Sequence, residues 1–203
     1  SDRCRKKVFE KMTVSKDNIF NIENPFPSWL VQYIEDQTKD VNWQFVSVPE
    51  EHEEGDKYKT PALFTDVMFC TQSNILDDHK ELTKLLHTAL TRDIIPNTIP
   101  DAEINQVTRT RLNGTVQNVY YGPHTDVSNN EPGLWTFVYY VNDADGDTIF
   151  FEEDGKTELT RTKYKKGNGV LFPAHYWHTM DLTTVPFRVT IGMTYSIETK
   201  LNG

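Results

Sequence analysis

Three side chains of the types that bind transition metals lie in two separate segments of the chain. His124 and Asp126 are two residues apart, and His178 follows at the end of residues 172–178. Side chains two apart in an extended strand point to the same face, so an imidazole and a carboxylate can lie side by side. Two histidines and one carboxylate leave three coordination positions open, which is typical of non-haem iron(II) sites, whereas catalytic zinc usually keeps one. His175 is the alternative third ligand.

A second set of residues could bind a carboxylate. Arg188 lies ten residues after His178, between the apolar residues Phe187 and Val189. A buried guanidinium needs a partner, and its planar fork matches a carboxylate held through two hydrogen bonds. Thr190 would share its face of the strand and could donate its hydroxyl to the same carboxylate. The alternative is a surface ion pair, but the apolar neighbours of Arg188 argue against it.

Aromatic residues near these segments are candidates for the same pocket. Tyr121 precedes the histidine–aspartate pair, while Trp135 and Tyr140 lie in a β-rich run. Aromatic side chains of sheets most often pack in the core. Sheet packing is therefore the favoured role of Tyr121, Tyr140 and Trp135. All three are also possible pocket residues, Tyr121 above all because it precedes the candidate ligand pair.

The second half of the chain has the pattern of short strands separated by turn residues. β-branched and aromatic residues are frequent in these strands. The runs are 104–112, 116–121, 134–141, 148–151, 157–164, 170–172 and 187–197. We expect an antiparallel sandwich or barrel whose strands position the candidate ligands.

The first half is expected to be mainly helical. Ser28 could cap a helix over 29–38, and apolar residues at three- and four-residue steps over 75–90 predict a second helix that ends before Pro96. The acidic segment 50–59 is expected to be an exposed loop. Helices followed by strands favour a β-sandwich that is buttressed by helices, with the double-sheet jelly roll as the leading version.

Composition narrows the class of protein. The chain has 203 residues, 37% of them hydrophobic and 12% aromatic, which suits one folded domain. Its formal net charge of -9 disfavours nucleic acids and anionic membranes as partners. The two cysteines, Cys4 and Cys70, have no metal-type spacing, and no apolar run predicts a signal peptide or membrane span. We expect a cytoplasmic protein of unspecified oligomeric state.

Several motifs together resemble the Fe(II)- and 2-oxoglutarate-dependent oxygenases, and most of all the prolyl-4-hydroxylase-like branch, over residues 105–197. The family's Y-x-x-H-x-D pattern, its Y-L-N strand end, its G-x-T-x-F turn and its G-x-x-x-x-F-P stretch match residues 121–126, 140–142, 146–150 and 167–178. An arginine and a threonine, Arg188 and Thr190, follow as in the family. Arg188 stands where prolyl hydroxylases commonly carry lysine.

The resemblance implies a double-stranded β-helix, a cupin-like jelly roll, and an oxygenase that uses Fe(II), 2-oxoglutarate and dioxygen. Oxidative decarboxylation of 2-oxoglutarate to succinate would be coupled to hydroxylation of an unactivated C–H bond. We expect a single oxygenase domain over 1–203, in which 1–100 is a helical support region and 101–203 is the β-helix core.

The resemblance also assigns roles to individual residues. His124, Asp126 and His178 would be the catalytic metal ligands, and Arg188 with Thr190 would bind 2-oxoglutarate. His178 is preferred over His175 as the third ligand because the family's ligand directly follows an aromatic residue, which is Trp177 here.

The substrate and two other functions stay open. A peptidyl or prolyl side chain is slightly favoured as substrate, and a free amino acid or another small molecule is the alternative. A cupin-like metal-binding protein that does not use 2-oxoglutarate is a second function, but it would not need Arg188. A purely structural β-sandwich is the third, and it predicts no metal uptake.

Overall fold

The protein is mainly β, with two antiparallel sheets. The computed structural model describes residues 13–39, 41, 43–47, 62–70, 80–119, 121–127 and 133–199, with 44–47 and 62–70 described by their backbone alone. The larger sheet contains β1 (Phe20–Ile22), β2 (Gln44–Ser47), β3 (Ala62–Cys70), β4 (Glu103–Val116), β5 (Leu134–Tyr140), β8 (Gly169–Pro173) and β10 (Phe187–Glu198). The smaller sheet contains β6 (Thr148–Phe151), β7 (Glu158–Thr162) and β9 (His178–Met180). Their spatial orders are β1-β8-β5-β10-β4-β3-β2 and β7-β6-β9.

The first hundred residues supply strands as well as helices. We expected helical support there, but β1, β2 and β3 all belong to the larger sheet. β3 pairs antiparallel with β4, and β1 pairs with β8 near the other edge. The pairing of a strand depends on tertiary contacts with distant segments. The local sequence pattern of these short segments therefore did not show that they join the sheet.

Two predictions about strands in the second half were wrong. β4 continues to Val116, where we expected a break after residue 112 and a new strand over 116–121. Gly114 lies inside β4, where its missing side chain leaves room for the rings of Phe187 and Trp43. The strand β9, which contains His178, was not predicted. It has only three residues and is defined by its pairing with β6.

The helical segments are η1 (Lys16–Asn18, a 3-10 turn), α1 (Ser28–Lys39), α2 (Lys80–Ala89), η2 (Leu90–Ile94, a π-helical turn) and α3 (Ile95–Thr98). Ser28 is the first residue of α1 and not the cap before it. Pro96 lies beyond the end of α2, as expected, and is in the first turn of α3. Proline is tolerated there because the first helical N–H groups have no partner within the helix.

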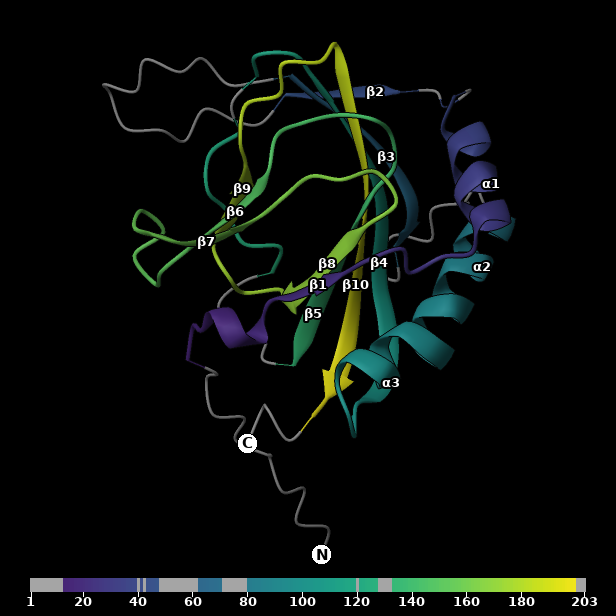
Figure 1. The fold of residues 1–203 in the computed structure, drawn as a ribbon, viewed down its shortest axis with the longest axis vertical. Coiled ribbons are helices and arrows are strands. Elements are labelled where there is room, and N and C mark those ends of the chain that lie inside the picture. The colour runs from purple at the N-terminus through teal and green to yellow at the C-terminus, as the bar shows by residue number, and fades with distance from the viewer. Residues whose placement is uncertain are drawn as a thin grey trace, which may run out of the picture.

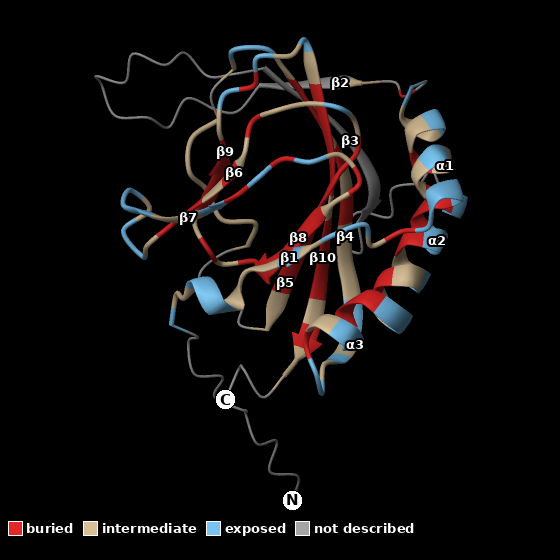
Figure 2. Ribbon diagram, in the orientation of Figure 1, coloured by how far each residue is buried: buried red, intermediate tan, exposed pale blue. Residues whose placement is uncertain are grey.

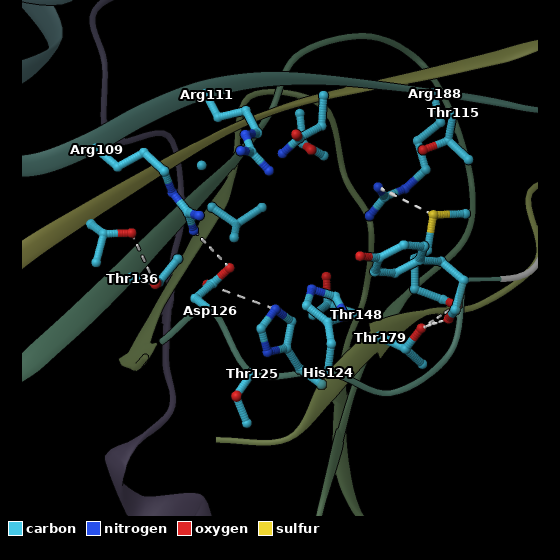
Figure 3. Close-up of a pocket in the computed structure, with 18 residues that line it drawn as sticks. Arg109, Arg111, Thr115, His124, Thr125, Asp126, Thr136, Thr148, Thr179 and Arg188 are labelled. Atoms are coloured by element: carbon cyan, nitrogen blue, oxygen red, sulfur yellow. Dashed lines mark hydrogen bonds and ion pairs between the residues drawn. The ribbon is translucent and has the colours of Figure 1, made fainter. Parts of the chain in front are cut away.

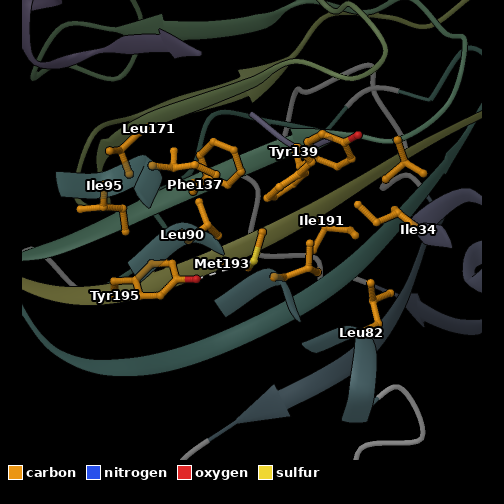
Figure 4. Close-up of a cluster of buried hydrophobic side chains, with 14 of the residues drawn as sticks. Ile34, Leu82, Leu90, Ile95, Phe137, Tyr139, Leu171, Ile191, Met193 and Tyr195 are labelled. Atoms are coloured by element: carbon orange, nitrogen blue, oxygen red, sulfur yellow. Dashed lines mark hydrogen bonds between the residues drawn. The ribbon is translucent and has the colours of Figure 1, made fainter. Parts of the chain in front are cut away.

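Helices α1, α2 and α3 lie along one side of the larger sheet, and the smaller sheet lies on the other (Figure 1). The helices bury the stripe of their surface that faces the strands (Figure 2). Figure 4 shows part of this core, where helix residues pack against side chains of β5, β8 and β10. The β10 residues in this cluster are Val189, Ile191, Met193, Tyr195 and Ile197.

The opposite face of the larger sheet carries mostly polar side chains in cross-strand rows. Alternate residues of β4 and β10 line a cavity there, and the register places them opposite one another. The opposed pairs are Thr115 with Arg188, Asn113 with Thr190, Arg111 with Gly192, and Arg109 with Thr194.

Some predictions fall on residues outside those described. They are the acidic loop over 50–59, the first turn of the helix predicted from residue 75, and Cys4. Within the described ranges, every helix is too short or too polar to cross a membrane.

Candidate metal centre and anion-binding cavity

A cavity of about 230 Å³ opens between the two sheets. Its lining comes from the inner face of β4, β5 and β10, from β9, and from residues 121–126 (Figure 3). It contains the candidate ligands His124, Asp126 and His178 together with Arg188 and Thr190. The structure therefore brings into one cavity the residues expected to bind metal and those expected to bind a carboxylate.

Backbone pairing brings the two candidate histidine ligands together. The N–H of His124 donates to the carbonyl of His178, and the N–H of His178 donates to the carbonyl of His124, both at 2.9 Å. The ring centroids of the two histidines lie 4.4 Å apart. Asp126 is anchored two residues on, where its N–H donates to the carbonyl of Ala174 at 3.0 Å. One potential ligand atom from each of His124, Asp126 and His178 lies within 4.8 Å of the others.

Backbone carbonyls orient the imidazole rings. Nδ1 of His178 lies 2.9 Å from the carbonyl of Tyr176, and Nδ1 of His124 lies 3.3 Å from the carbonyl of Gly122. Because a carbonyl only accepts, these Nδ1 atoms carry the proton in the neutral rings and leave Nε2 with a free electron pair. Burial, with the neighbouring His178, lowers the pKa of His124 to about 4. His124 is thus neutral near pH 7, as a ligand must be.

The two carboxylate oxygens of Asp126 face different groups, one toward a cation and the other toward the candidate histidine ligands. Its Oδ1 accepts a hydrogen bond from Nη2 of Arg109 at 3.1 Å. Its Oδ2 is buried, has no hydrogen-bond partner, and lies 3.8 Å from Nε2 of His178. Burial raises the pKa of Asp126, but the charges of His178 and Arg109 outweigh burial and hold it below its ordinary value.

The donor set fits a divalent metal ion. A buried carboxylate oxygen without a hydrogen-bond partner is costly unless a cation satisfies it. Here Asp126 Oδ2 lies beside two histidines whose Nε2 atoms are acceptors. Two nitrogens and one oxygen on one side of a site suit non-haem iron, and the fixed Nδ1 contacts are the outer partners that such ligands usually have. His175 follows β8 in a turn and is not part of this cluster.

Arg188 is a buried cation at the cavity wall. Its side chain is 5% exposed, and its Nε donates to the carbonyl of Gly146 at 3.2 Å. The guanidinium carbon lies 4.7 Å from the ring centre of Tyr164 and 6.0 Å from that of Tyr140. Burial lowers the pKa of Arg188, and no described carboxylate forms an ion pair with it. Such a group is suited to an anion that enters from the cavity.

The other candidate pocket residues have different positions. Thr190 and Tyr121 line the cavity, and the ring of Tyr121 lies edge-on to His124 at 4.6 Å between centroids. Tyr140 is fully buried in a second apolar cluster and is not part of the cavity lining, although its hydroxyl lies 2.9 Å from Oγ1 of the lining residue Thr148. Trp135 is fully buried in the core on the helix side, so it is not a pocket residue, and sheet packing, the favoured role, is the one it has. Its neighbour Thr136 faces the cavity, because adjacent strand residues point to opposite faces.

The sequence analysis missed Arg109 and Arg111, which line the cavity from β4. Their signal was the alternation over residues 109–115, in which every second side chain is polar. The strand predicted over 104–112 contains both arginines, but the pattern alone does not show which of its faces meets the site. Figure 3 shows both arginines on the side of the cavity where Asp126 lies, away from Arg188.

Comparison with known proteins gives structural matches alone, since no family model and no curated sequence matches the chain. An oxidoreductase of the 2OG-Fe(II) oxygenase family from Burkholderia pseudomallei has a TM-score of 0.70 at 13% identity, covering 89% of this chain and 86% of that one. A prolyl hydroxylase from Trichoplax adhaerens, in complex with a hypoxia inducible factor peptide, has a TM-score of 0.61 at 14% identity, covering 89% and 84%. The non-haem alpha-ketoglutarate-dependent carbocyclase SnoK from nogalamycin biosynthesis has a TM-score of 0.64 at 12% identity, covering 90% and 83%. The chain therefore has the fold of the 2OG-Fe(II) oxygenases, prolyl hydroxylases among them.

Proposed function

We propose that the protein is an Fe(II)- and 2-oxoglutarate-dependent oxygenase that couples oxidative decarboxylation of 2-oxoglutarate to hydroxylation of a substrate. One observation carries this proposal: the cluster of His124, Asp126 and His178 shares a cavity with the buried cation Arg188. A metal-binding protein without an oxoacid has no need of a buried guanidinium there, because the guanidinium costs desolvation energy. Similarity to the fold of known 2OG-Fe(II) oxygenases supports the same conclusion.

The side chains would divide the work of holding the two groups. His124, Asp126 and His178 would hold the iron and leave positions open for the oxoacid and dioxygen. Arg188 would hold the far carboxylate of 2-oxoglutarate, and the hydroxyl of Thr190 would donate to it. When bound, Fe(II), 2-oxoglutarate and dioxygen supply the oxidising chemistry of the hydroxylation.

The surroundings of His178 would keep that ligand in place. Its ring lies 4.8 Å from the ring of Phe172 and 6.2 Å from that of Phe150, as measured between centroids. These aromatic side chains keep the imidazole out of water, and the Tyr176 carbonyl fixes its tautomer. The ligand is therefore oriented before the metal arrives, which reduces the entropy lost on binding.

We further infer that the two sheets form a double-stranded β-helix within one oxygenase domain over 1–203. The core would span 101–203, with β1, β2 and β3 of the region 1–100 extending its larger sheet. Alternation between a helix-covered face and a cavity-lining face supports this assignment.

Anaerobic titration of the Fe(II) protein with 2-oxoglutarate tests the proposal. We expect the weak visible charge-transfer band of the iron–oxoacid chelate, and we expect it to be lost in His178→Ala. His175→Ala is the matched control, because this histidine is three residues away and outside the cluster. Bound iron without a band in the wild-type protein would favour a cupin-like metal protein that does not use 2-oxoglutarate. No metal uptake at all would favour a structural β-sandwich.

The substrate would be a peptidyl or prolyl side chain or a small molecule. Among similar structures, the prolyl hydroxylase is in complex with a peptide fragment, and SnoK is a carbocyclase from nogalamycin biosynthesis. A peptide complex and a carbocyclase thus share this fold, so the substrate of this chain would depend on the side chains of its cavity.

A further inference from the structure

Arg188 lies where β10 has lost one of its neighbouring strands. The pairing of β10 with β5 begins only at Thr190, so the residues on either side of Arg188 have no partner in β5. The side-chain amide of Asn142 takes the place of that strand. Its Nδ2 donates to the carbonyl of Phe187 at 2.8 Å, and its Oδ1 accepts from the N–H of Val189 at 2.8 Å. One amide therefore fixes the backbone on both sides of Arg188.

Tyr164 packs against the guanidinium of Arg188. The guanidinium carbon lies 4.7 Å from the ring centre, inside the range of about 6 Å over which an aromatic face attracts a cation. The hydroxyl of Tyr164 donates to the carbonyl of Val189 at 2.8 Å and also lies 3.1 Å from Oδ1 of Asn142. At the other end of the residue, its N–H donates to Oδ1 of Asp147 at 3.1 Å. The ring cannot turn away from Arg188 without breaking these hydrogen bonds.

The turn at Gly146 also contacts Arg188. Its carbonyl accepts from Nε of Arg188 at 3.2 Å. A Cβ added to Gly146, which has a φ of +89°, would lie 2.8 Å from the carbonyl oxygen of Asp181, so this turn requires glycine. Within the described parts of the chain, the other hydrogen-bond acceptor of the guanidinium is the Met180 sulfur, 3.9 Å from Nη1 (Figure 3). Sulfur is a weak acceptor, so the Nη atoms are left to bind an anion in the cavity.

We propose that Tyr164 is a positioning residue: it holds Arg188 at a fixed distance from the cluster of His124, Asp126 and His178, and so makes the cavity selective for the length of the oxoacid. The inference rests on the proposed function, because it takes Arg188 as the group that binds the far carboxylate. A dicarboxylate that bridges the metal cluster and a fixed cation must have one particular length. An arginine without such contacts has a long flexible side chain that can follow a shorter or longer ligand. A cation ordered in advance also loses less conformational entropy on binding.

The first measurement tests the contact in metal-free protein without any oxoacid. The Nε–H signal of Arg188 is followed by nitrogen–proton NMR and identified by its loss in Arg188→Lys. We expect this proton to exchange slowly with water, because it is buried and bonded to the carbonyl of Gly146. In Tyr164→Leu, which removes the ring, exchange should be about ten-fold faster. In Tyr164→Phe, which keeps the ring and loses the hydroxyl, it should rise by about three-fold at most.

The second measurement compares 2-oxoglutarate with 2-oxoadipate, which is one methylene longer. Each is titrated into anaerobic Fe(II) protein, and both the chelate band and the heat of binding are recorded. We expect the wild-type protein to prefer 2-oxoglutarate by at least about ten-fold. Tyr164→Leu should bind 2-oxoglutarate about ten-fold more weakly and prefer it over 2-oxoadipate by about three-fold or less. Tyr164→Phe should keep the wild-type preference.

A matched control separates positioning from packing. Tyr195 is a fully buried tyrosine of β10, the strand of Arg188, but it packs in the core on the helix side. Tyr195→Leu should therefore lower stability while leaving both the exchange of the Arg188 proton and the oxoacid preference unchanged. If Tyr164→Leu does not fold, Tyr164→Met takes its place, because the longer methionine side chain fills more of the space left by the ring.

Several outcomes would overturn the inference. They are wild-type exchange of the Arg188 proton in Tyr164→Leu, an unchanged oxoacid preference in that variant, and no preference in the wild-type protein. Equal changes in Tyr195→Leu would also overturn it, because they would follow from lost stability and not from the contact with Arg188. Failure of the wild-type protein to bind either oxoacid would instead contradict the proposed function, and the exchange rates would still decide whether Tyr164 holds Arg188.

Discussion

The two faces of β10 are built from alternate residues of one strand and serve different purposes. The face toward the helices carries Val189, Ile191 and Met193, all buried in a continuous apolar cluster. The face toward the smaller sheet carries Arg188 and Thr190, which are as buried but polar. Burial alone therefore does not separate core from site in this protein. The separation depends on whether the buried side chains satisfy one another or are left to meet a ligand.

The largest effect is expected from removing the negative charge on the cavity face. Asp126→Asn keeps the shape of the side chain but removes its negative charge, the buried Oδ2 that is a candidate metal ligand, and the ion pair with Arg109. We expect oxygenase activity to be lost. Iron affinity should fall by more than the 10- to 100-fold that is typical when a residue hydrogen-bonded to a metal ligand is replaced. Iron content after dialysis measures this. An Asn variant that retains iron at full occupancy would contradict the role of Asp126.

A matched change on the helix-covered face should act on stability and leave the cavity intact. Leu86 of α2 is fully buried in the core, so Leu86→Ala should lower the free energy of unfolding by about 2–5 kcal/mol. Denaturant unfolding measures the loss. Iron binding well below the unfolding transition should be unchanged, and reduced iron affinity in the folded variant would show that the two faces are coupled.

The pH dependence of stability should come from partly buried histidines on both faces. On the helix side, burial lowers the pKa of His87 from 6.5 to about 4, and its ring nitrogens lie 2.8 Å from the Tyr195 hydroxyl and 2.9 Å from that of Thr110. Below pH 6.5 the unfolded chain takes up a proton that folded His87 does not, so stability falls as the pH drops toward 4.

For His87 that loss amounts to up to about 3 kcal/mol. Metal-free protein should therefore unfold more easily at pH 4.5 than at pH 7, and His87→Gln should reduce the difference by about half. The remainder should come from His124, whose pKa is also near 4. An unchanged pH profile in His87→Gln would contradict the assignment to His87.

The smallest effect is expected from replacing Arg109, which hydrogen-bonds to the candidate metal ligand Asp126. Arg109→Gln removes the cation that holds Oδ1 of Asp126 and should weaken iron binding by about 10- to 100-fold, without loss of the fold. Competition with a metal chelator measures the affinity. Arg109→Lys should restore part of the iron affinity, because the lysine ammonium can still donate a hydrogen bond to the Asp126 carboxylate. Equal affinity in all three proteins would mean that Arg109 does not position the ligand.

Local spacing carried much of the information about the site. The two members of the H-x-D pair, and likewise those of the arginine–threonine pair, are two residues apart in the sequence. In an extended strand the period is two, so such side chains point to the same face. The same period, applied to residues 109–115, would also have indicated the polar face that holds Arg109 and Arg111. It could not show whether Trp135 or Thr136 faces the cavity, since either face of β5 is plausible until the helices are placed.

The sequence by itself determined the types of residue at the site, their spacing along each strand, and the mainly β character of the second half. Tertiary structure alone decided that β1, β2 and β3 join the larger sheet, that His178 pairs with His124, and that Arg188 lies across the cavity from Arg111. The reason is physical. Alternation within a strand follows from backbone geometry, but the partner of a strand and the face that becomes core depend on which distant surfaces bury each other.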